Sequence, residues 1–392
     1  MKILIGHDTY PPDVNGAARF TERLAIGMLG RGHEVHVIAP STTGRAFTEE
    51  QDGIIVHRMP SHRYPLVDQF QICMPWEVAG RINRILDEVK PDVVHIQGHF
   101  LITRLLSKRA RDRGIPLVAT NHFMPENLVE LVKIPQRVRD AVSRLAWRDA
   151  AKVLGRAQIV TAPTPRAVEL LASSAGLPGG IAISCGIDAP QYARAASRAA
   201  AREIPNVLFV GRLDQEKRVD ELIRAFAKLP SDVPARLEIV GDGSQREDWK
   251  ALVEKVGIAD RTVFHGFISE ADLLDAYGRC DVFVMPGVAE LQSLVTLESM
   301  AAGKPVIAAN AMALPHLVHP EENGYLFEPG DVDELAGHLE TLLRDPALRA
   351  EMGQRSKAIA GRHALGATLD RFESLYGGVI EGGVIPIRRA AA

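Results

Sequence analysis

The chain has 392 residues, 46% of them hydrophobic and 24% charged, with a formal net charge of −3. This length predicts two domains, the composition is typical of a soluble globular protein, and the small net charge gives no reason to expect a nucleic-acid partner. Three cysteines without a CxxC pair favour a reducing compartment and no structural zinc. With no apolar run near about 18 residues and no secretory h-region, we expect a cytoplasmic protein.

The first half of the chain alternates short aliphatic runs with longer helical patterns, which is typical of βαβ units and parallel sheets. The strands predicted there are Lys2–Gly6, Glu34–Ala39, Gly53–Arg58, Asp92–Gln97, Pro116–Thr120, Ile159–Ala162 and Gly180–Ser184. Phe20, Leu24 and Met28 recur every four residues after the first strand and predict an amphipathic helix. In 188–203 alanine and arginine dominate, so we interpret that stretch as the connection between domains.

The second half repeats the alternation and so predicts a second doubly wound unit. Its predicted strands are Asn206–Arg212, Arg236–Gly241, Thr262–Gly266, Asp281–Met285, Pro305–Ala309 and Gly324–Phe327. Its predicted helices fall at about 217–229, 244–256, 270–278, 293–302 and 331–344. The fold class is therefore α/β, with two Rossmann-like domains at 1–197 and 204–365.

Two polar loops follow predicted strands of the first domain and contain candidate site residues. Gly16 stands between the first strand and its helix, where it lets the backbone approach a phosphate or an acceptor; a plain tight turn is the alternative. His122 follows the Pro116–Thr120 strand, so its imidazole can hydrogen-bond sugar hydroxyls or take a proton near neutral pH. His95 and His99, after the preceding strand, are weaker candidates for the same edge.

A cationic constellation opens the second domain. Gly211 ends its first strand, Arg212 follows at once, and Lys217 stands at the start of the next predicted helix. Two cations beside a helix amino terminus predict an anion site, because oriented N–H groups and positive charge act together. A nucleoside diphosphate carries the matching charge. The alternative is a surface arginine and lysine in ion pairs with Asp214 and Glu216.

Two carboxylates lie where a later strand gives way to a helix. Glu290 follows the breakers Pro286 and Gly287, and Glu298 lies two turns into the next predicted helix. Ligands bind at the carboxyl ends of open parallel sheets, and acceptor-only groups there suit a sugar and a ribose. Asp331 and Asp333 look like a metal-binding DxD, but their place at a helix start favours capping.

The candidate residues occur in the order found in one family. They are Gly16, His122, Gly211 with Arg212 and Lys217, and the pair Glu290 and Glu298. Together they resemble the family 4 retaining glycosyltransferases of GT-B architecture. The resemblance implies two Rossmann-like domains facing a cleft, with the acceptor in the first and the donor in the second. It also implies a C-terminal segment, 366–392, whose helix packs back on the first domain.

The resemblance implies a role for each matching residue. Arg212 and Lys217 would hold the diphosphate, Glu298 the ribose, and Glu290 with His122 the sugar. The donor-binding set is Gly16, Gly211, Arg212, Lys217, Glu290, Leu291, Gln292, Ser293 and Glu298. No metal and no cofactor is expected. Leu291-Gln292-Ser293 stand where the family often has Phe-Gly, so the base, uridine or guanosine, and the sugar stay open.

The stretch from Asn121 to Leu128 and Glu290-Leu291-Gln292-Ser293 look most like bacterial members that glycosylate membrane lipids. Cations then alternate with apolar residues in a basic amphipathic segment that can rest on anionic lipid at the inner membrane face. These residues are Lys133, Arg137, Arg139, Arg144 and Arg148 among Leu131, Ile134, Val138, Val142 and Leu145. An ordinary helix with a solvated cationic face explains the pattern equally well.

Three other readings stay open. The acceptor could be a soluble small molecule or a polysaccharide rather than a glycerolipid. A nucleotide-sugar epimerase or a sugar phosphorylase has a similar architecture, although a phosphorylase needs a cofactor lysine or a second phosphate site. A non-catalytic module would bind a sugar nucleotide without releasing the nucleotide from it.

Overall fold

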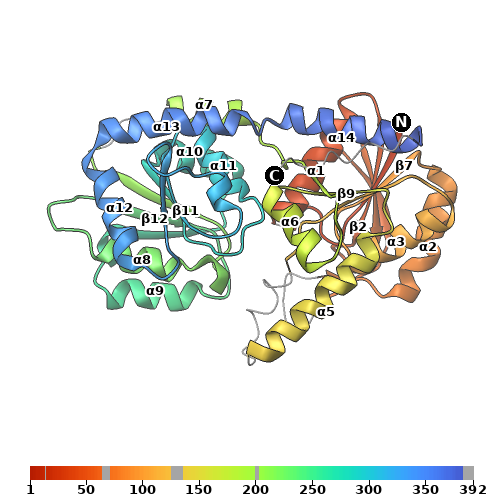
Figure 1. Ribbon diagram of the computed structural model, residues 1–392, viewed down its shortest axis with the longest axis horizontal. Coiled ribbons are helices and arrows are strands. Elements are labelled where there is room, and N and C mark those ends of the chain that lie inside the picture. Colours follow the sequence, from red (N-terminus) through yellow and green to blue (C-terminus); the bar gives the residue numbers. More distant parts are fainter. Residues whose placement is uncertain (14, 64–70, 125–135, 199–202, 383–392) are drawn as a thin grey trace. The chain divides into compact units, whose positions relative to one another are not determined.

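The computed structural model describes residues 1–13, 15–63, 71–124, 136–198 and 203–382. These residues form two compact units (Figure 1). The first unit contains the described residues up to Cys185 and those from Gly366 onward, and the second contains those from Gly186 to Leu365. Each unit is built around its own sheet, and no helix in the described residues is both long and apolar enough to cross a bilayer.

The first unit is built on an eight-stranded sheet of order β10-β9-β8-β7-β1-β2-β4-β3. Its strands are β1 (Lys2–Gly6), β2 (Glu34–Pro40), β3 (Phe47–Gln51), β4 (Ile54–Met59), β7 (Val93–Ile96), β8 (Leu117–Thr120), β9 (Ile159–Ala162) and β10 (Ile181–Ala182). All neighbours pair in parallel except β3, which runs antiparallel to β4 at the edge. β5 (His62–Arg63) and β6 (Gln71–Ile72) form a separate small hairpin.

Helices cover both faces of this sheet, as parallel strands require. They are α1 (Gly16–Leu29), α2 (Pro75–Val89), α3 (Leu101–Asp112), α5 (Gln136–Leu154), α6 (Pro165–Ser174) and α14 (Leu365–Ile380). Phe20, Leu24 and Met28 of α1 are fully buried, which confirms the predicted amphipathic face.

The C-terminal helix α14 packs in the first unit although it ends the described chain. Phe372 and Tyr376 are buried on one helical face, and the Phe372 ring lies 5.8 Å from that of Phe20. Arg31, in the turn after α1, forms ion pairs of 2.6 Å with Asp370 and Glu373. The helix therefore belongs to the same core as α1, and the unit is assembled from both ends of the sequence.

The second unit is built on a six-stranded parallel sheet of order β13-β12-β11-β14-β15-β16. The strands are β11 (Asn206–Val210), β12 (Arg236–Val240), β13 (Thr262–Gly266), β14 (Val282–Met285), β15 (Val306–Ala309) and β16 (Gly324–Phe327). The helices are α7 (Ala189–Arg198), α8 (Val219–Ala227), α9 (Arg246–Lys255), α10 (Glu270–Arg279), α11 (Leu294–Ala301), α12 (Val332–Arg344) and α13 (Pro346–Gly361), with short 3₁₀ turns at Gln215–Lys217, Ala259–Arg261 and Leu314–His316.

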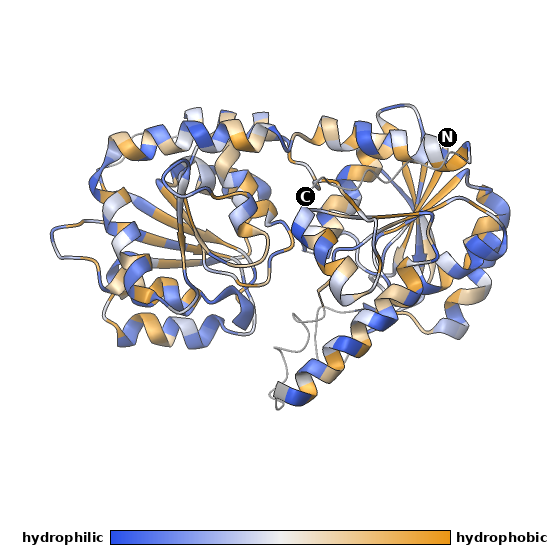
Figure 2. Ribbon diagram, in the orientation of Figure 1, coloured by the Kyte–Doolittle hydropathy of each residue, from blue (hydrophilic) through white to orange (hydrophobic). Residues whose placement is uncertain are grey.

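Both sheets are apolar while the outer faces of the helices are polar (Figure 2). This confirms the predicted α/β class with two doubly wound halves. Two details differ from the prediction. The polar strand β3 carries no apolar run and forms only by pairing with β4. Residues Ala189–Arg198 of the alanine- and arginine-rich stretch form α7, whose Tyr192 packs edge-on against Tyr277 at 5.6 Å.

Candidate functional site

In the second unit, the loops after β11 and β12 meet backbone to backbone. Gly211 follows β11 and donates its N–H to the Val240 carbonyl at 3.0 Å. Gly241 has a φ of +129°, and a Cβ there would lie 1.8 Å from the Gly211 oxygen. A side chain at 241 would therefore force the two loops apart. Gly243 likewise has no room for a Cβ beside Leu213.

Arg212 stands at the carboxyl end of β11 with its side chain about half exposed. Its guanidinium forms ion pairs with Asp214 at 2.9 Å and Glu216 at 3.0 Å. Asp214 also accepts hydrogen bonds from the backbone and hydroxyl of Ser244. The sequence analysis left open that Arg212 only forms ion pairs with Asp214 and Glu216, and the structure does contain these ion pairs. The same pairs fix the direction in which Arg212 presents its remaining donors.

Lys217 ends the 3₁₀ turn before α8, and its ammonium donates to the carboxylate of Glu290. Both side chains are mostly buried, at 15% and 12% exposed. Glu290 lies in the loop after β14, where its carbonyl accepts from the Ala313 N–H at 3.1 Å. The structure therefore brings together two of the predicted site residues, one from the β11 loop and one from the β14 loop.

Glu298 lies on α11 and is 6% exposed. Its Oε2 accepts a hydrogen bond of 2.9 Å from the hydroxyl of Tyr277, a residue that the sequence patterns did not single out. Burial, followed by the charge of Glu298, raises the pKa of Tyr277 well above its ordinary value, so the hydroxyl stays a donor. A carboxylate has about four lone-pair sites, so this bond leaves Glu298 able to accept from other hydroxyls.

Leu291, Gln292 and Ser293 follow Glu290 and form the loop that leads directly into α11. Gln292 and Ser293 are buried, at 4% and 5% exposed. Ser293 has φ +64°, a left-handed conformation that is uncommon outside glycine, and its hydroxyl bonds that of Thr296 at 2.8 Å. The first turn of α11 is thereby held by a strained residue, as is frequent in ligand-binding loops.

In the first unit, His122 follows β8 and its Nε2 lies 2.7 Å from Oε1 of Gln97. Burial lowers the pKa of His122 to about 4, so the ring is neutral at pH 7 and Nε2 carries the proton that it donates to Gln97. Its ring packs at 5.1 Å from Phe20. Of the two roles predicted for His122, this favours hydrogen bonding by a neutral imidazole over proton uptake near neutral pH.

The two weaker histidine candidates have different surroundings. His95 is fully buried and bonded on both sides, by the hydroxyls of Tyr376 and Thr120 at 2.7 Å each, so it supports the sheet edge. His99 packs against Phe100 and Phe123 in an aromatic cluster.

Gly16 is the first residue of α1, and the side chain of Asn15 caps that helix by accepting from the Ala18 N–H at 2.8 Å. Asn15 thus has a local structural function as a helix cap. In the second unit, Asp331 accepts from the Glu334 N–H at 2.9 Å at the start of α12, which confirms the predicted helix cap.

Tyr277, Gln97 and Ser244 were missed because each acts through another residue's side chain. No local sequence signal distinguishes them, since their partners are 21, 25 and 30 residues away. Gly241 and Gly243 are identified by the structure, which shows them at the close approach of two loops.

Comparison with known proteins agrees with this geometry. Residues 14–190 match the family described as Glycosyltransferase Family 4, and residues 195–359 match Glycosyl transferases group 1. A GDP-mannose-dependent alpha-mannosyltransferase of Mycolicibacterium smegmatis is 32% identical over 336 residues, 84% of each chain. The protein of the same name from Mycobacterium tuberculosis is 30% identical over 341 residues, 85% of each chain. The chain therefore belongs to the family 4 glycosyltransferases.

Solved structures agree on the fold. Sucrose-phosphate synthase from Thermosynechococcus elongatus superimposes with a TM-score of 0.81 at 22% identity, over 97% of this chain and 100% of that one. HepE of Anabaena in complex with UDP gives 0.74 at 22% identity, over 96% and 100%. Both likenesses extend over nearly the whole chain, so each unit and the C-terminal helix have counterparts in the shared fold.

Proposed function

We propose that the protein is a retaining hexosyltransferase that moves a hexose from a nucleoside-diphosphate sugar to a hydroxyl acceptor. The observation that carries the proposal is the meeting of Lys217 with Glu290 beside Arg212, at the carboxyl ends of β11 and β14. A cation pair there suits a diphosphate, and buried carboxylates suit sugar and ribose hydroxyls.

In this proposal Arg212 and Lys217 stabilise the negative charge that grows on the departing diphosphate, so the reaction needs no metal ion and no cofactor. Groups held in place by Asp214, Glu216 and Glu290 cost little reorganisation at the moment of reaction. Glu298 accepts from the ribose, while Glu290 and the neutral His122 orient the hexose. The acceptor then attacks the face that the leaving group departs from, which retains the anomeric configuration.

The donor is tested first by thermal stabilisation, because a ligand that binds only the folded state raises its melting temperature. A panel of GDP- and UDP-hexoses is compared, starting with GDP-mannose because the relatives at 30% and 32% identity carry that donor in their names. An acceptor-dependent release of nucleoside diphosphate, with product of the donor's anomeric configuration, supports transfer. Conversion of the sugar without an acceptor indicates an epimerase, and binding without release indicates a non-catalytic module.

For the acceptor we propose a membrane glycerolipid, reached by docking of α5 on an anionic bilayer. The first half of α5 exposes Val138, Val142 and Leu145, which recur at i, i+4 and i+7 and are 47%, 42% and 62% exposed. Arg144 and Arg148 are also exposed on this helix. Lys133, Leu131 and Ile134 of the predicted segment lie outside the described residues.

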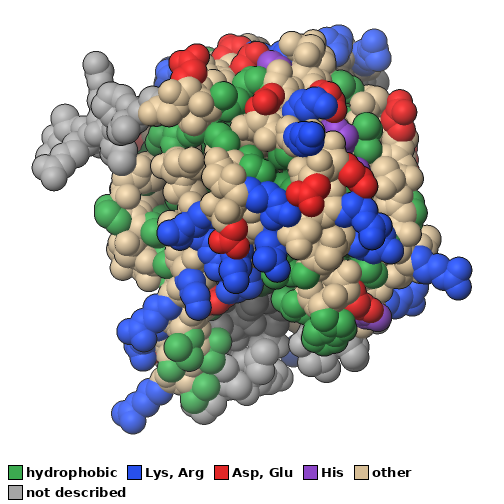
Figure 3. Space-filling view, turned by 90° about the vertical axis from the view of Figure 1, so that its right-hand side faces the viewer, with side chains coloured by type: hydrophobic (Ala, Val, Ile, Leu, Met, Phe, Trp, Pro, Cys, Tyr) green, Lys and Arg blue, Asp and Glu red, His purple; other side chains and the backbone are tan. Residues whose placement is uncertain are grey.

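The second half of α5 is anchored through buried Trp147, Ala150 and Leu154. In Figure 1 this helix reaches past the sheet of its own unit. The face of the molecule in Figure 3, on the side where α2 and α3 lie, also carries a broad gathering of Lys and Arg side chains. An apolar stripe among cations is the pattern of a helix that lies in the interface of an anionic membrane. We accordingly propose a cytoplasmic protein that binds peripherally to the inner membrane face.

Vesicle sedimentation tests this docking. Wild-type protein should bind phosphatidylglycerol vesicles at low salt and should be released at high salt. The double variant Val142→Gln/Leu145→Gln should bind markedly less, while Val263→Gln, which changes a 44% exposed valine of the second unit, should bind like wild type. Wild-type protein that stays in solution with these vesicles would direct the proposal to a soluble or polysaccharide acceptor.

A further inference from the structure

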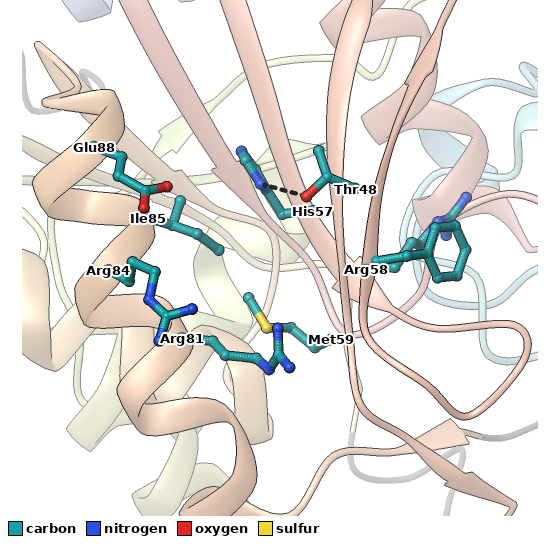
Figure 4. Close-up of a pocket in the computed structure, with 9 residues that line it drawn as sticks. Thr48, His57, Arg58, Met59, Arg81, Arg84, Ile85 and Glu88 are labelled. Carbon is teal, nitrogen blue, oxygen red and sulfur yellow. Dashed lines mark hydrogen bonds between the residues drawn. The ribbon is translucent and has the colours of Figure 1, made fainter.

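A cavity of about 340 Å³ lies in the first unit between α2 and the edge strands β3 and β4 (Figure 4). It shares no residue with the candidate donor or sugar site. Its lining is Phe47, Thr48, His57, Arg58, Met59, Arg81, Arg84, Ile85 and Glu88. The volume is within the range of about 300–1,000 Å³ that is usual for small-molecule sites.

The sheet side of the cavity is held rigid by a row of hydrogen-bonded side chains. Thr48 lies 3.4 Å from Nδ1 of His57, whose Nε2 lies 3.1 Å from Nδ1 of His36. The other nitrogen of His36 lies 3.1 Å from Glu34, which also pairs with Lys2 at 3.2 Å. This row crosses β3, β4, β2 and β1 and fixes the orientation of the His57 ring.

His57 supplies no positive charge here, because burial and then the neighbouring His36 lower its pKa to about 4. Arg58 is also occupied: its guanidinium pairs with Glu49 at 2.7 Å and donates to the Pro11 and Pro40 carbonyls. The cations left to act on a ligand are therefore those of the opposite, helical side.

Arg81 and Arg84 of α2 extend toward Met59 in Figure 4. Within the described residues, neither guanidinium has a hydrogen-bond or ion-pair partner, although like charges at i, i+3 on one helix repel each other. The lining also contains the apolar side chains of Met59, Ile85 and Phe47, so the cavity is amphipathic. Glu88 completes the rim with a hydroxyl acceptor.

We propose that this cavity is a second ligand site, for a phosphate monoester carried on a small hydroxylated skeleton. Arg81 and Arg84 bind the phosphate, because planar guanidinium forks match its oxygens bidentately. The carbon skeleton covers Met59 and Phe47, and its hydroxyls donate to Glu88. The ester comes either from a free polyol or sugar phosphate or from the headgroup of a phosphatidic-acid-like lipid.

Isothermal titration of the full chain with glycerol 3-phosphate and glucose 6-phosphate tests the site, with glucose as the unphosphorylated control. The wild-type protein should bind both phosphate esters saturably and should show no binding of glucose. The double variant Arg81→Gln/Arg84→Gln should bind about tenfold more weakly or worse, as expected for losing charge-assisted hydrogen bonds. The lipid source is tested in parallel by comparing both proteins on phosphatidic acid and phosphatidylcholine vesicles, with α5 unchanged in each.

The matched control is Lys108→Gln/Arg111→Gln, which removes two exposed charges at the same spacing from the neighbouring helix α3. It should bind every probe like wild type. A loss of binding confined to the α2 variant, for a free ester or for phosphatidic acid, supports the proposal and identifies the source. The proposal is overturned if wild type binds neither probe, if the α2 variant binds like wild type, or if both double variants weaken binding equally. Donor binding and hexosyl transfer are measured separately, so failure here leaves the proposed function untouched.

Discussion

The hydroxyl of Tyr376 lies 2.7 Å from Nδ1 of His95, although the two residues are 281 positions apart in the chain. Both side chains are fully buried. Gln97, 3.2 Å from the His95 ring nitrogens, also accepts from His122 at 2.7 Å. The C-terminal helix α14 is thus connected through two side chains to the histidine that we propose contacts the sugar.

Removing the tyrosine hydroxyl should destabilise the first unit. Tyr376→Phe leaves a ring nitrogen of His95 buried with one partner fewer, which costs about 1–3 kcal/mol. Differential scanning calorimetry should show a lower unfolding temperature for this variant. Tyr325→Phe is the control, since Tyr325 is half-buried, stacks on His338 and should unfold close to wild type. An unchanged melting temperature in Tyr376→Phe would show that water or Gln97 replaces the lost bond.

Arg212 should affect turnover more than folding. Arg212→Ala removes charge-assisted hydrogen bonds to the leaving diphosphate, worth about 1.5–3 kcal/mol, so kcat should fall roughly 10- to 150-fold. Arg212 is half exposed but its partners Asp214 and Glu216 are mostly buried, so the melting temperature should fall as well, although less markedly than kcat. Steady-state kinetics and thermal unfolding are measured on the same preparations. Arg224→Ala, a half-exposed arginine on α8, should retain wild-type kcat; full turnover by Arg212→Ala would remove the role proposed for this residue.

The buried histidines predict how the first unit responds to acid. Burial lowers the pKa of His7 and His95 to about 3 and that of His122 to about 4, from 6.5. Below pH 6.5 the unfolded chain binds protons that the native state does not, so these groups contribute stability that is lost as pH falls from 6.5 toward 4. Each contributes a slope of about 1.4 kcal/mol per pH unit.

Unfolding followed by calorimetry between pH 7 and 4.5 measures this slope. His95→Gln should reduce the proton uptake on unfolding by about one, because glutamine does not titrate. His62→Gln, which changes an exposed histidine, should leave the slope of wild type. A wild-type stability that is flat across this range would contradict the neutral, buried state of these rings.

A second pH prediction concerns Glu238 in the second unit. Burial raises the pKa of this carboxyl, but hydrogen bonds and charge from Arg279, with His265, bring it below its ordinary 4.5. Its stabilising contribution is therefore complete above pH 4.5 and is lost as pH falls through the lower native value. Arg279→Gln leaves the buried carboxylate without its bidentate partner and should cost about 3–5 kcal/mol at pH 7.

In this variant Arg279 no longer lowers the pKa of Glu238, whereas burial still raises it. The stability difference between variant and wild type should therefore shrink as pH falls from 7 to 4, when the carboxyl takes up a proton. Melting temperatures at several pH values measure it. Arg344→Gln breaks an exposed pair with Asp232 and should show only a small difference at every pH. A difference that stays constant with pH would mean that the lost packing of Arg279, not its charge, dominates.

The thirteen strands read from apolar runs are all present, and Lys217 with Glu290 meet as a pair although 73 residues separate them. Parallel strands explain the success, because their carboxyl ends gather at one sheet edge whatever the loops do. The polar strand β3 could not be read in this way. This strand forms because a two-residue loop places it beside β4, and it has no hydrophobic pattern of its own.

Local residue types determined the alternation of strands and helices, the caps at Asn15 and Asp331, and the positions of the glycine, arginine and glutamates around the second sheet. Those features depend on short-range sterics and on burial of periodic apolar side chains. Only the tertiary structure decided that Tyr277 bonds Glu298, that Tyr376 bonds His95, and that Arg81 and Arg84 line a cavity with no partner among the described residues. Each of these depends on which helix packs on which strand, and a side chain's partner or lack of one is fixed by that packing rather than by its neighbours in sequence.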